Sequence, residues 1–88
     1  MIILDAKDFS SQEKFYKLLN QNIDFYYYVE NLDALYDFLV TTDYDIRIIN
    51  YRYMFINLGE YGQRLVTVFI DAVKDYGAKV SLEYGDGI

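Results

Sequence analysis

Three short apolar runs, separated by segments with helical periodicity, constrain the fold of this chain more than any other feature. The runs cover residues 1–5 (MIILD), 45–50 (DIRIIN) and 78–84 (AKVSLEY), and each has the composition of a short strand. Strands that are joined through helices pair in parallel, with right-handed crossover connections. The order strand, two helices, strand, two helices, strand therefore predicts an α/β fold with a three-stranded parallel sheet. We expect about four helices, packed mainly on one face.

The first two predicted helices carry N-terminal capping signals. Ser10 and Glu13 have the spacing of a capping box, in which each side chain accepts a hydrogen bond from a free backbone N–H group. We expect residues 20–22 (NQN) to end this first helix. Asn31 is the expected N-cap of the second helix, which should run to about Thr41.

The third and fourth helices are predicted from apolar spacing and from glycine. Residues 51–59 form a short candidate helix that ends near a glycine. Residues 62–77 have apolar side chains at a spacing of 3.6, and Gly77 suits the turn that ends this helix. The chain has no proline, no flexible linker and no internal repeat. We therefore expect a single domain over residues 1–84 and a frayed tail over residues 85–88.

Composition excludes several classes of function. The 88 residues carry a net charge of −6 and include no histidine and no cysteine. Serine–histidine and cysteine–histidine nucleophile pairs are therefore absent, as are the usual zinc ligand sets. An acidic domain of this size repels nucleic acid and attracts basic surfaces. We expect a binding protein rather than an enzyme, without a metal or cofactor.

Hydropathy and cysteine usage bear on location. No apolar run approaches the length of a membrane span. The segment MIILD is too short and too quickly acidic for a secretory signal peptide. The absence of cysteine is compatible with a reducing compartment. We therefore expect a cytoplasmic protein that does not bind membranes. The complete set of helix signals and strands predicts a domain that folds alone and is a monomer when free.

The stretch YYVENLDALYDFL, residues 27–39, combines the second helix with an unexpected charge pattern. At 100° per residue, Asp33 and Asp37 lie within about 40° of each other, well away from the leucine-rich core face. Like charges at this spacing cost a helix roughly 0.2–0.5 kcal/mol. Asp33 can favour the helix dipole, but Asp37 has no Lys or Arg three or four residues away. Glu30 extends the same acidic edge, and Tyr36 flanks it. A solvated helix face is the simple alternative to a binding surface.

The same stretch resembles the signature of the barstar family, intracellular inhibitors of microbial ribonucleases. The family pattern runs Tyr-Tyr-Gly-x-Asn-Leu-Asp-Ala-Leu-Trp-Asp. Eight positions match, namely Tyr27, Tyr28, Asn31, Leu32, Asp33, Ala34, Leu35 and Asp37. The order of elements agrees with the family over about residues 1–84, and TVFIDAVKDYG resembles its last helix.

The resemblance implies a mechanism and a set of binding residues. Members of this family plug a ribonuclease active site with the acidic helix and the loop before it, so that carboxylates replace RNA phosphates. By position, Asp33 and Asp37 would be the phosphate mimics, and Tyr27 would pack against the region of the catalytic histidine. Asp71 falls where the family carries an acidic residue on its last helix, and Glu30 and Tyr36 complete the predicted surface. The implied partner is a small basic secreted ribonuclease or a related toxin.

The chain also departs from the family pattern. Val29 stands in place of Gly, whose absence changes the backbone turns available there. Tyr36 replaces Trp, and residues 40–42 (VTT) replace Thr-Gly-Trp. By the resemblance, the change at residues 40–42 affects contacts to the guanine-binding loop of the enzyme, and the identity of the target stays open.

Two other functions fit parts of the sequence. Paired carboxylates could act as acid and base, as in glycosidases, but adjacent turns of an open helix offer no pocket that excludes water. Alternatively, the aromatic loop FYYY, residues 25–28, could mediate self-association or another protein contact without ribonuclease inhibition.

Overall fold

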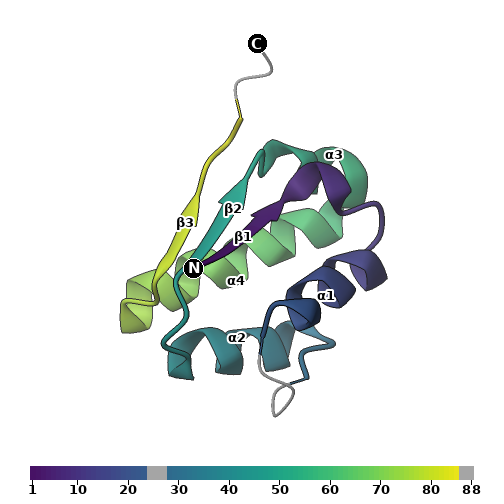
Figure 1. Ribbon diagram of the computed structural model, residues 1–88. Coiled ribbons are helices and arrows are strands. Elements are labelled where there is room, and N and C mark those ends of the chain that lie inside the picture. The colour runs from purple at the N-terminus through teal and green to yellow at the C-terminus, as the bar shows by residue number, and fades with distance from the viewer. Residues whose placement is uncertain (24–27, 86–88) are drawn as a thin grey trace.

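The computed structural model describes residues 1–23 and 28–85. Three parallel strands form one sheet in the order β1-β2-β3, and four α-helices and one short 3₁₀ helix, η1, accompany them in the described part of the chain (Figure 1). The elements are β1 (Ile2–Asp5), η1 (Ala6–Asp8), α1 (Gln12–Gln21), α2 (Leu32–Thr41), β2 (Ile46–Ile49), α3 (Arg52–Leu58), α4 (Glu60–Tyr76) and β3 (Val80–Leu82). The predicted α/β fold with a three-stranded parallel sheet is confirmed.

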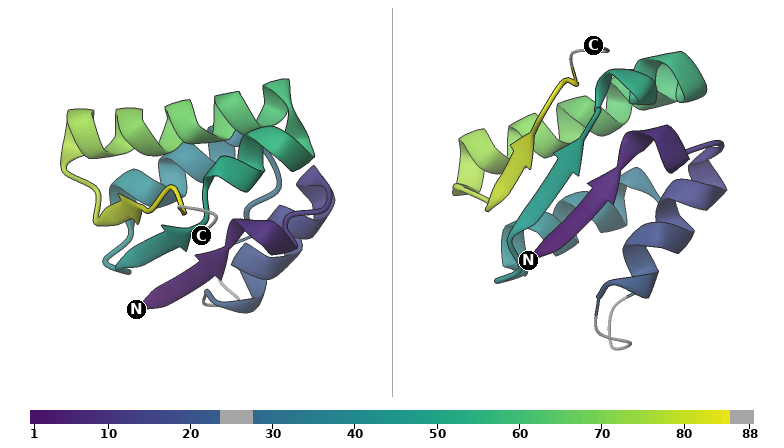
Figure 2. Two further views of the ribbon diagram at one scale, coloured as in Figure 1. Left: turned by 90° about the horizontal axis from the view of Figure 1, so that it is seen from above. Right: turned by 45° about the horizontal axis from the view of Figure 1, so that its top comes forward.

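The sheet has one apolar face and one open face. Leu4 pairs with Ile48, and Ile48 pairs with Leu82, so that these three side chains form a row toward the helices. Ile3 points the other way and is 52% exposed. The first strand is therefore buried on one side only, because α2 and α4 lie on the same side of the sheet (Figure 2).

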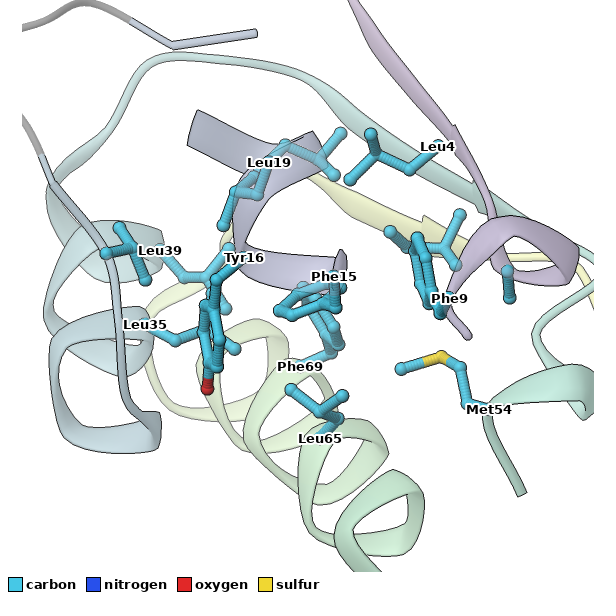
Figure 3. Packing of buried hydrophobic residues seen from close by; sticks show 14 of the residues in the cluster. Leu4, Phe9, Phe15, Tyr16, Leu19, Leu35, Leu39, Met54, Leu65 and Phe69 are labelled. Carbon is cyan, nitrogen blue, oxygen red and sulfur yellow. The ribbon is translucent and has the colours of Figure 1, made fainter. Parts of the chain in front are cut away.

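Aromatic side chains fill the core between the sheet and the helices. The ring centroid of Phe15 lies 4.9 Å from that of Phe9 and 6.3 Å from that of Phe69, both in edge-to-face geometry (Figure 3). Leu35 and Leu39 bring α2 into the same core, and both are almost fully buried. The core thus fixes the rotation of α2 about its axis. This rotation determines which side chains of α2 are exposed to solvent.

The first helix begins and ends later than the sequence suggested. Ser11 is the N-cap, and its hydroxyl accepts a hydrogen bond from the Lys14 N–H group at 3.1 Å, so the prediction of Ser10 is wrong. Ser10 instead continues the turn after η1, where its N–H group bonds the Asp8 carbonyl. Residues 20 and 21 remain helical, and Asn22 ends the helix by bonding the carbonyl groups of the last turn.

The later elements follow the predictions with small shifts. Gly59 (φ 55°) ends α3, and α4 begins at the next residue, two positions earlier than predicted. Gly77 (φ 65°) ends α4 in the left-handed region, as predicted. Gly85 lies against Asn50, and residues 86–88 of the predicted tail lie outside the described residues. Within the described ranges, no helix is long and apolar enough to cross a membrane.

Candidate protein-binding surface

The start of α2 sets the register of its acidic side chains. Asn31 has an extended backbone, and its side-chain oxygen accepts a hydrogen bond from the Ala34 N–H group at 2.8 Å, which confirms the predicted N-cap. From this start, Leu35, Phe38 and Leu39 fall on the buried side of the helix. The opposite side of α2 therefore faces solvent.

Asp33 and Asp37 occupy that solvent-facing side, one turn apart. Both side chains are exposed, and neither takes part in an ion pair among the residues that the structure describes. The Thr41 hydroxyl donates a hydrogen bond to the backbone carbonyl of Asp37 at 2.7 Å. This bond does not involve the Asp37 carboxylate. Two negative charges are thus presented to solvent without local compensation.

Tyr36 connects this acidic side of α2 to α4. Its hydroxyl donates a hydrogen bond to Asp75 Oδ2 at 3.2 Å, and its ring meets that of Tyr76 at a centroid distance of 6.2 Å. Partial burial, the hydrogen bond to Asp75 and the nearby negative charges of Asp75 and Asp71 raise the pKa of the Tyr36 phenol. Tyr36 is therefore neutral and holds the two helices together.

Asp71 and Asp75 extend the negative charge onto α4. They lie one turn apart on the side of α4 that faces Tyr36, and both are exposed. We call the carboxylates of Asp33, Asp37, Asp71 and Asp75, together with Tyr36 between them, the acidic surface. The structure thus brings the predicted Asp71 to the predicted Tyr36 and adds Asp75 to the set.

Asp75 is the residue that sequence reasoning missed. The signal that could have found it is the spacing of four from Asp71, the same spacing that drew attention to Asp33 and Asp37. Among the described residues, the basic side chains of α4 form no ion pair with this surface. Arg64 pairs with Glu60 at 3.1 Å, and Lys74 lies beside Val80 on the β3 side of the helix.

Glu30 lies at a separate place, beside a cleft between α1 and the segment before α2. This cleft has a volume of about 630 Å³, with Glu30 and Tyr28 on one wall and Tyr16, Lys17 and Asn20 among the α1 residues on the other. Glu30 is exposed, so it can meet a partner that also covers the cleft. Tyr27, which the sequence predicted as a contact residue, lies outside the described residues.

The segment before α2 is held by one side chain of α1. Asn20 accepts a hydrogen bond from the Val29 N–H group at 2.9 Å and donates one to the Val29 carbonyl at 2.7 Å. The Val29 side chain is 2% exposed and joins the core. The residue that replaces the family's Gly is therefore an anchor, which fixes the chain immediately before Glu30.

The exposed carboxylates of the acidic surface are suited to binding cationic groups. The acidic side chains lie on open helix faces, and within the described ranges no group of His, Cys, Asp or Glu residues could hold a metal ion. Exposed carboxylates on rigid helices can bind cationic groups of a partner, and an open helix face has no pocket that encloses a substrate. The protein is thus a small α/β domain with an exposed acidic surface on two of its helices.

Comparison with protein-family models assigns the domain to a family. The model described as Barstar (barnase inhibitor) matches residues 1–84 of the chain. The chain belongs to the barstar family, which is a family of inhibitors and not of catalysts. A search of curated proteins gives no match.

Proposed function

We propose that this protein inhibits a small basic secreted ribonuclease, or a related toxin, by covering its active site. Support comes from the acidic surface on a barstar-family fold, and above all from Asp33 and Asp37, whose carboxylates are exposed and have no ion-pair partner within the described residues. A ribonuclease active site binds RNA phosphates through cationic side chains. Carboxylates at phosphate-like positions satisfy the same cations.

In this mechanism the acidic surface acts in two stages. Its negative charge, within a net charge of −6, attracts the basic enzyme and orients the encounter. On docking, Asp33 and Asp37 lose water and gain charge-assisted hydrogen bonds to cations of the enzyme. Tyr36, Asp71 and Asp75 surround these contacts, and Glu30 binds at the edge near α1. Tyr27 adds the contact that the family resemblance implies. One domain occupies one enzyme active site.

The biological role that follows is immunity in the cytoplasm. A cell that makes a secreted ribonuclease must protect its own RNA until the enzyme has been exported. An acidic inhibitor does not itself bind that RNA, because like charges repel. We therefore propose that the protein acts in the cytoplasm, with a protein partner and without nucleic acid or membrane binding.

A contact domain without ribonuclease inhibition is the alternative. Tyr28 is 72% exposed beside the cleft that Glu30 lines, and exposed tyrosine is favoured at protein interfaces. A partner that binds through this tyrosine would not need the carboxylates of α2. The two functions therefore differ in their dependence on Asp33 and Asp37.

The test is affinity capture with a matched bait. The wild-type domain and a variant with Asp33→Asn and Asp37→Asn are immobilised separately and exposed to extract and culture medium of the source organism. We expect the wild-type domain alone to retain a small basic protein with ribonuclease activity, which the free domain then inhibits at a one-to-one ratio. Capture of the same proteins by both baits, without ribonuclease activity, would favour the alternative.

A further inference from the structure

The edge of the sheet at β3 has hydrogen-bonding groups that are not used by a neighbouring strand. β3 pairs with β2 on one side, and no strand of the described residues pairs with its other side, which is the free edge of the sheet (Figure 1). Lys79 and Glu83 bond β2 through their backbone groups, so the alternate residues Val80 and Leu82 direct theirs away from it. The Val80 N–H group is already bonded to the Ala78 carbonyl. The Val80 carbonyl and both backbone groups of Leu82 therefore point to the free edge.

The same edge continues into an apolar groove beside α4. The groove has a volume of about 280 Å³, and its lining includes Phe69, Val80 and Leu82. On its helix side, Ile70 is 50% exposed and Val73 is 40% exposed. An open strand edge beside uncovered apolar side chains is a site for strand addition by another chain.

The sequence of the edge strand is complementary to itself. Residues 79–83 read Lys-Val-Ser-Leu-Glu, so an antiparallel copy centred on Ser81 sets Lys79 opposite Glu83 at both ends. Val80 and Leu82 then face each other, and Ser81 faces its equivalent. Within the described residues Lys79 has no ion-pair partner, and Glu83 pairs with Arg47 on the exposed face.

We propose that this edge binds a second copy of the chain, with the two β3 strands antiparallel about a twofold axis at Ser81. The backbone groups of Val80 and Leu82 point to the free edge, so these residues form the hydrogen-bonded pairs of the new ladder. Ser81 forms a non-hydrogen-bonded pair with its equivalent. The Leu82 N–H group of each copy donates to the Val80 carbonyl of the other. The three parallel strands of each copy join into one sheet of six.

Pairing at this edge also covers the groove and leaves the acidic surface open. The added strand of the second copy lies next to Ile70 and Val73, on the β3 side of α4. Tyr36 meets Asp75 on the other side of α4. At 100° per residue, Asp75 lies about 160° around the helix from Val73. Each copy of the dimer can therefore still bind one enzyme. The short contact makes the dimer weak, so the chain is a monomer when dilute.

Charge-reversal variants of the full chain test this pairing directly. Lys79→Glu alone and Glu83→Lys alone each place two like-charge pairs across the twofold axis. An equimolar mixture of the two variants restores two opposite-charge pairs in the heterodimer. In sedimentation equilibrium from low micromolar to near-millimolar concentration, we expect the wild type to dimerise, each variant to associate about tenfold more weakly or worse, and the mixture to recover. Circular dichroism melts establish that both variants fold.

A cross-link tests the geometry independently, because the chain has no cysteine of its own. In the proposed dimer, position 81 is a non-hydrogen-bonded pair, whose Cα atoms lie about 4.5 Å apart, within the roughly 4.4–6.8 Å range of disulfides, so Ser81→Cys should form an intermolecular disulfide under mild oxidation. Thr67→Cys, on the exposed side of α4, is the control and should remain largely unlinked.

Two sedimentation results would overturn the proposal. One is a wild-type chain that stays monomeric at every concentration, and the other is charge-reversal variants and a mixture that all associate like the wild type.

Discussion

The two carboxylates of α2 repel each other in the free protein. Asp33 and Asp37 are four residues apart on the exposed side of the helix, and no described cation pairs with either one. The pair therefore carries a cost to the folded state, and under the proposed function this cost is offset when a basic partner binds. If the proposed function holds, stability and function make opposite demands on the acidic surface.

This opposition predicts the stability of the neutral variants. We expect Asp37→Asn to stabilise the free domain slightly, by tenths of a kcal/mol, because a like-charge pair is removed. Asp33→Asn should be near neutral, since the same relief is offset by a lost carboxylate in the first turn of the helix. Urea unfolding midpoints measure both changes. A loss above about 2 kcal/mol for either variant would mean that the carboxylate has a structural role.

The buried phenol of Tyr16 makes stability depend on alkaline pH. Burial, followed by the 2.5 Å hydrogen bond to the Tyr61 hydroxyl, raises the pKa of Tyr16 above its ordinary value of 10.0. Because the folded-state pKa is higher than the unfolded one, this stabilising contribution is complete below about pH 10 and is lost as the pH rises further. Tyr36, whose pKa is also raised, adds to the same fall.

Denaturant unfolding across this alkaline range is the measurement. We expect the free energy of unfolding to decline above about pH 10, and Tyr16→Phe to make the decline shallower. Tyr84→Phe, which removes an exposed hydroxyl, is the matched control. An equally steep decline in the Tyr16 variant would assign the effect to other groups.

Helices α3 and α4 pack closely at a buried glycine, Gly62. A Cβ atom on Gly62 would lie 1.9 Å from the Met54 carbonyl oxygen, which belongs to the backbone of α3 and cannot rotate away. We expect Gly62→Ala to separate the two helices and to destabilise the domain by about 1–3 kcal/mol or more. Gln63→Ala, one residue further on the exposed side of α4, is the control and should change thermal stability little. Equal melting temperatures for the two variants would contradict this packing.

Elements with a local signal were the most predictable from the sequence. Asn31 caps α2 and Gly77 ends α4 as expected, because each signal depends on a short stretch of backbone. The choice between Ser10 and Ser11 could not be made in this way. It depends on the turn after η1, which the sequence did not reveal and which uses the Ser10 N–H group.

The acidic surface shows the same division between local and distant information. The pairing of Asp33 with Asp37 follows from helical spacing alone. The contact of Tyr36 with Asp75 joins residues 39 positions apart, and it depends on how α2 packs against α4. The role of Val29 as a buried anchor likewise depends on Asn20 of α1, so the sequence identified the substitution but not its structural consequence.

At the scale of the whole molecule, charge and fold act together. The net charge of −6 attracts basic proteins of any kind, and in the proposed function the fixed positions of the carboxylates on α2 and α4 select one of them. Added salt should therefore slow association with the target more than it speeds dissociation, since screening acts mainly on the encounter. Association rates measured over a salt series test this directly, and a dissociation rate that carries most of the salt dependence would contradict it.

The most direct test of the account is the binding kinetics of Asp37→Ala with the captured ribonuclease. Asp37 lies mid-helix on the acidic surface, and truncating one member of a desolvated charge pair typically costs about 2–5 kcal/mol of binding free energy. The control Asp8→Ala removes the same charge from η1. We predict a large loss of affinity for Asp37→Ala, a smaller loss for Asp33→Ala and little change for Asp8→Ala. Equal affinities for Asp37→Ala and Asp8→Ala would show that α2 does not carry the inhibitory surface.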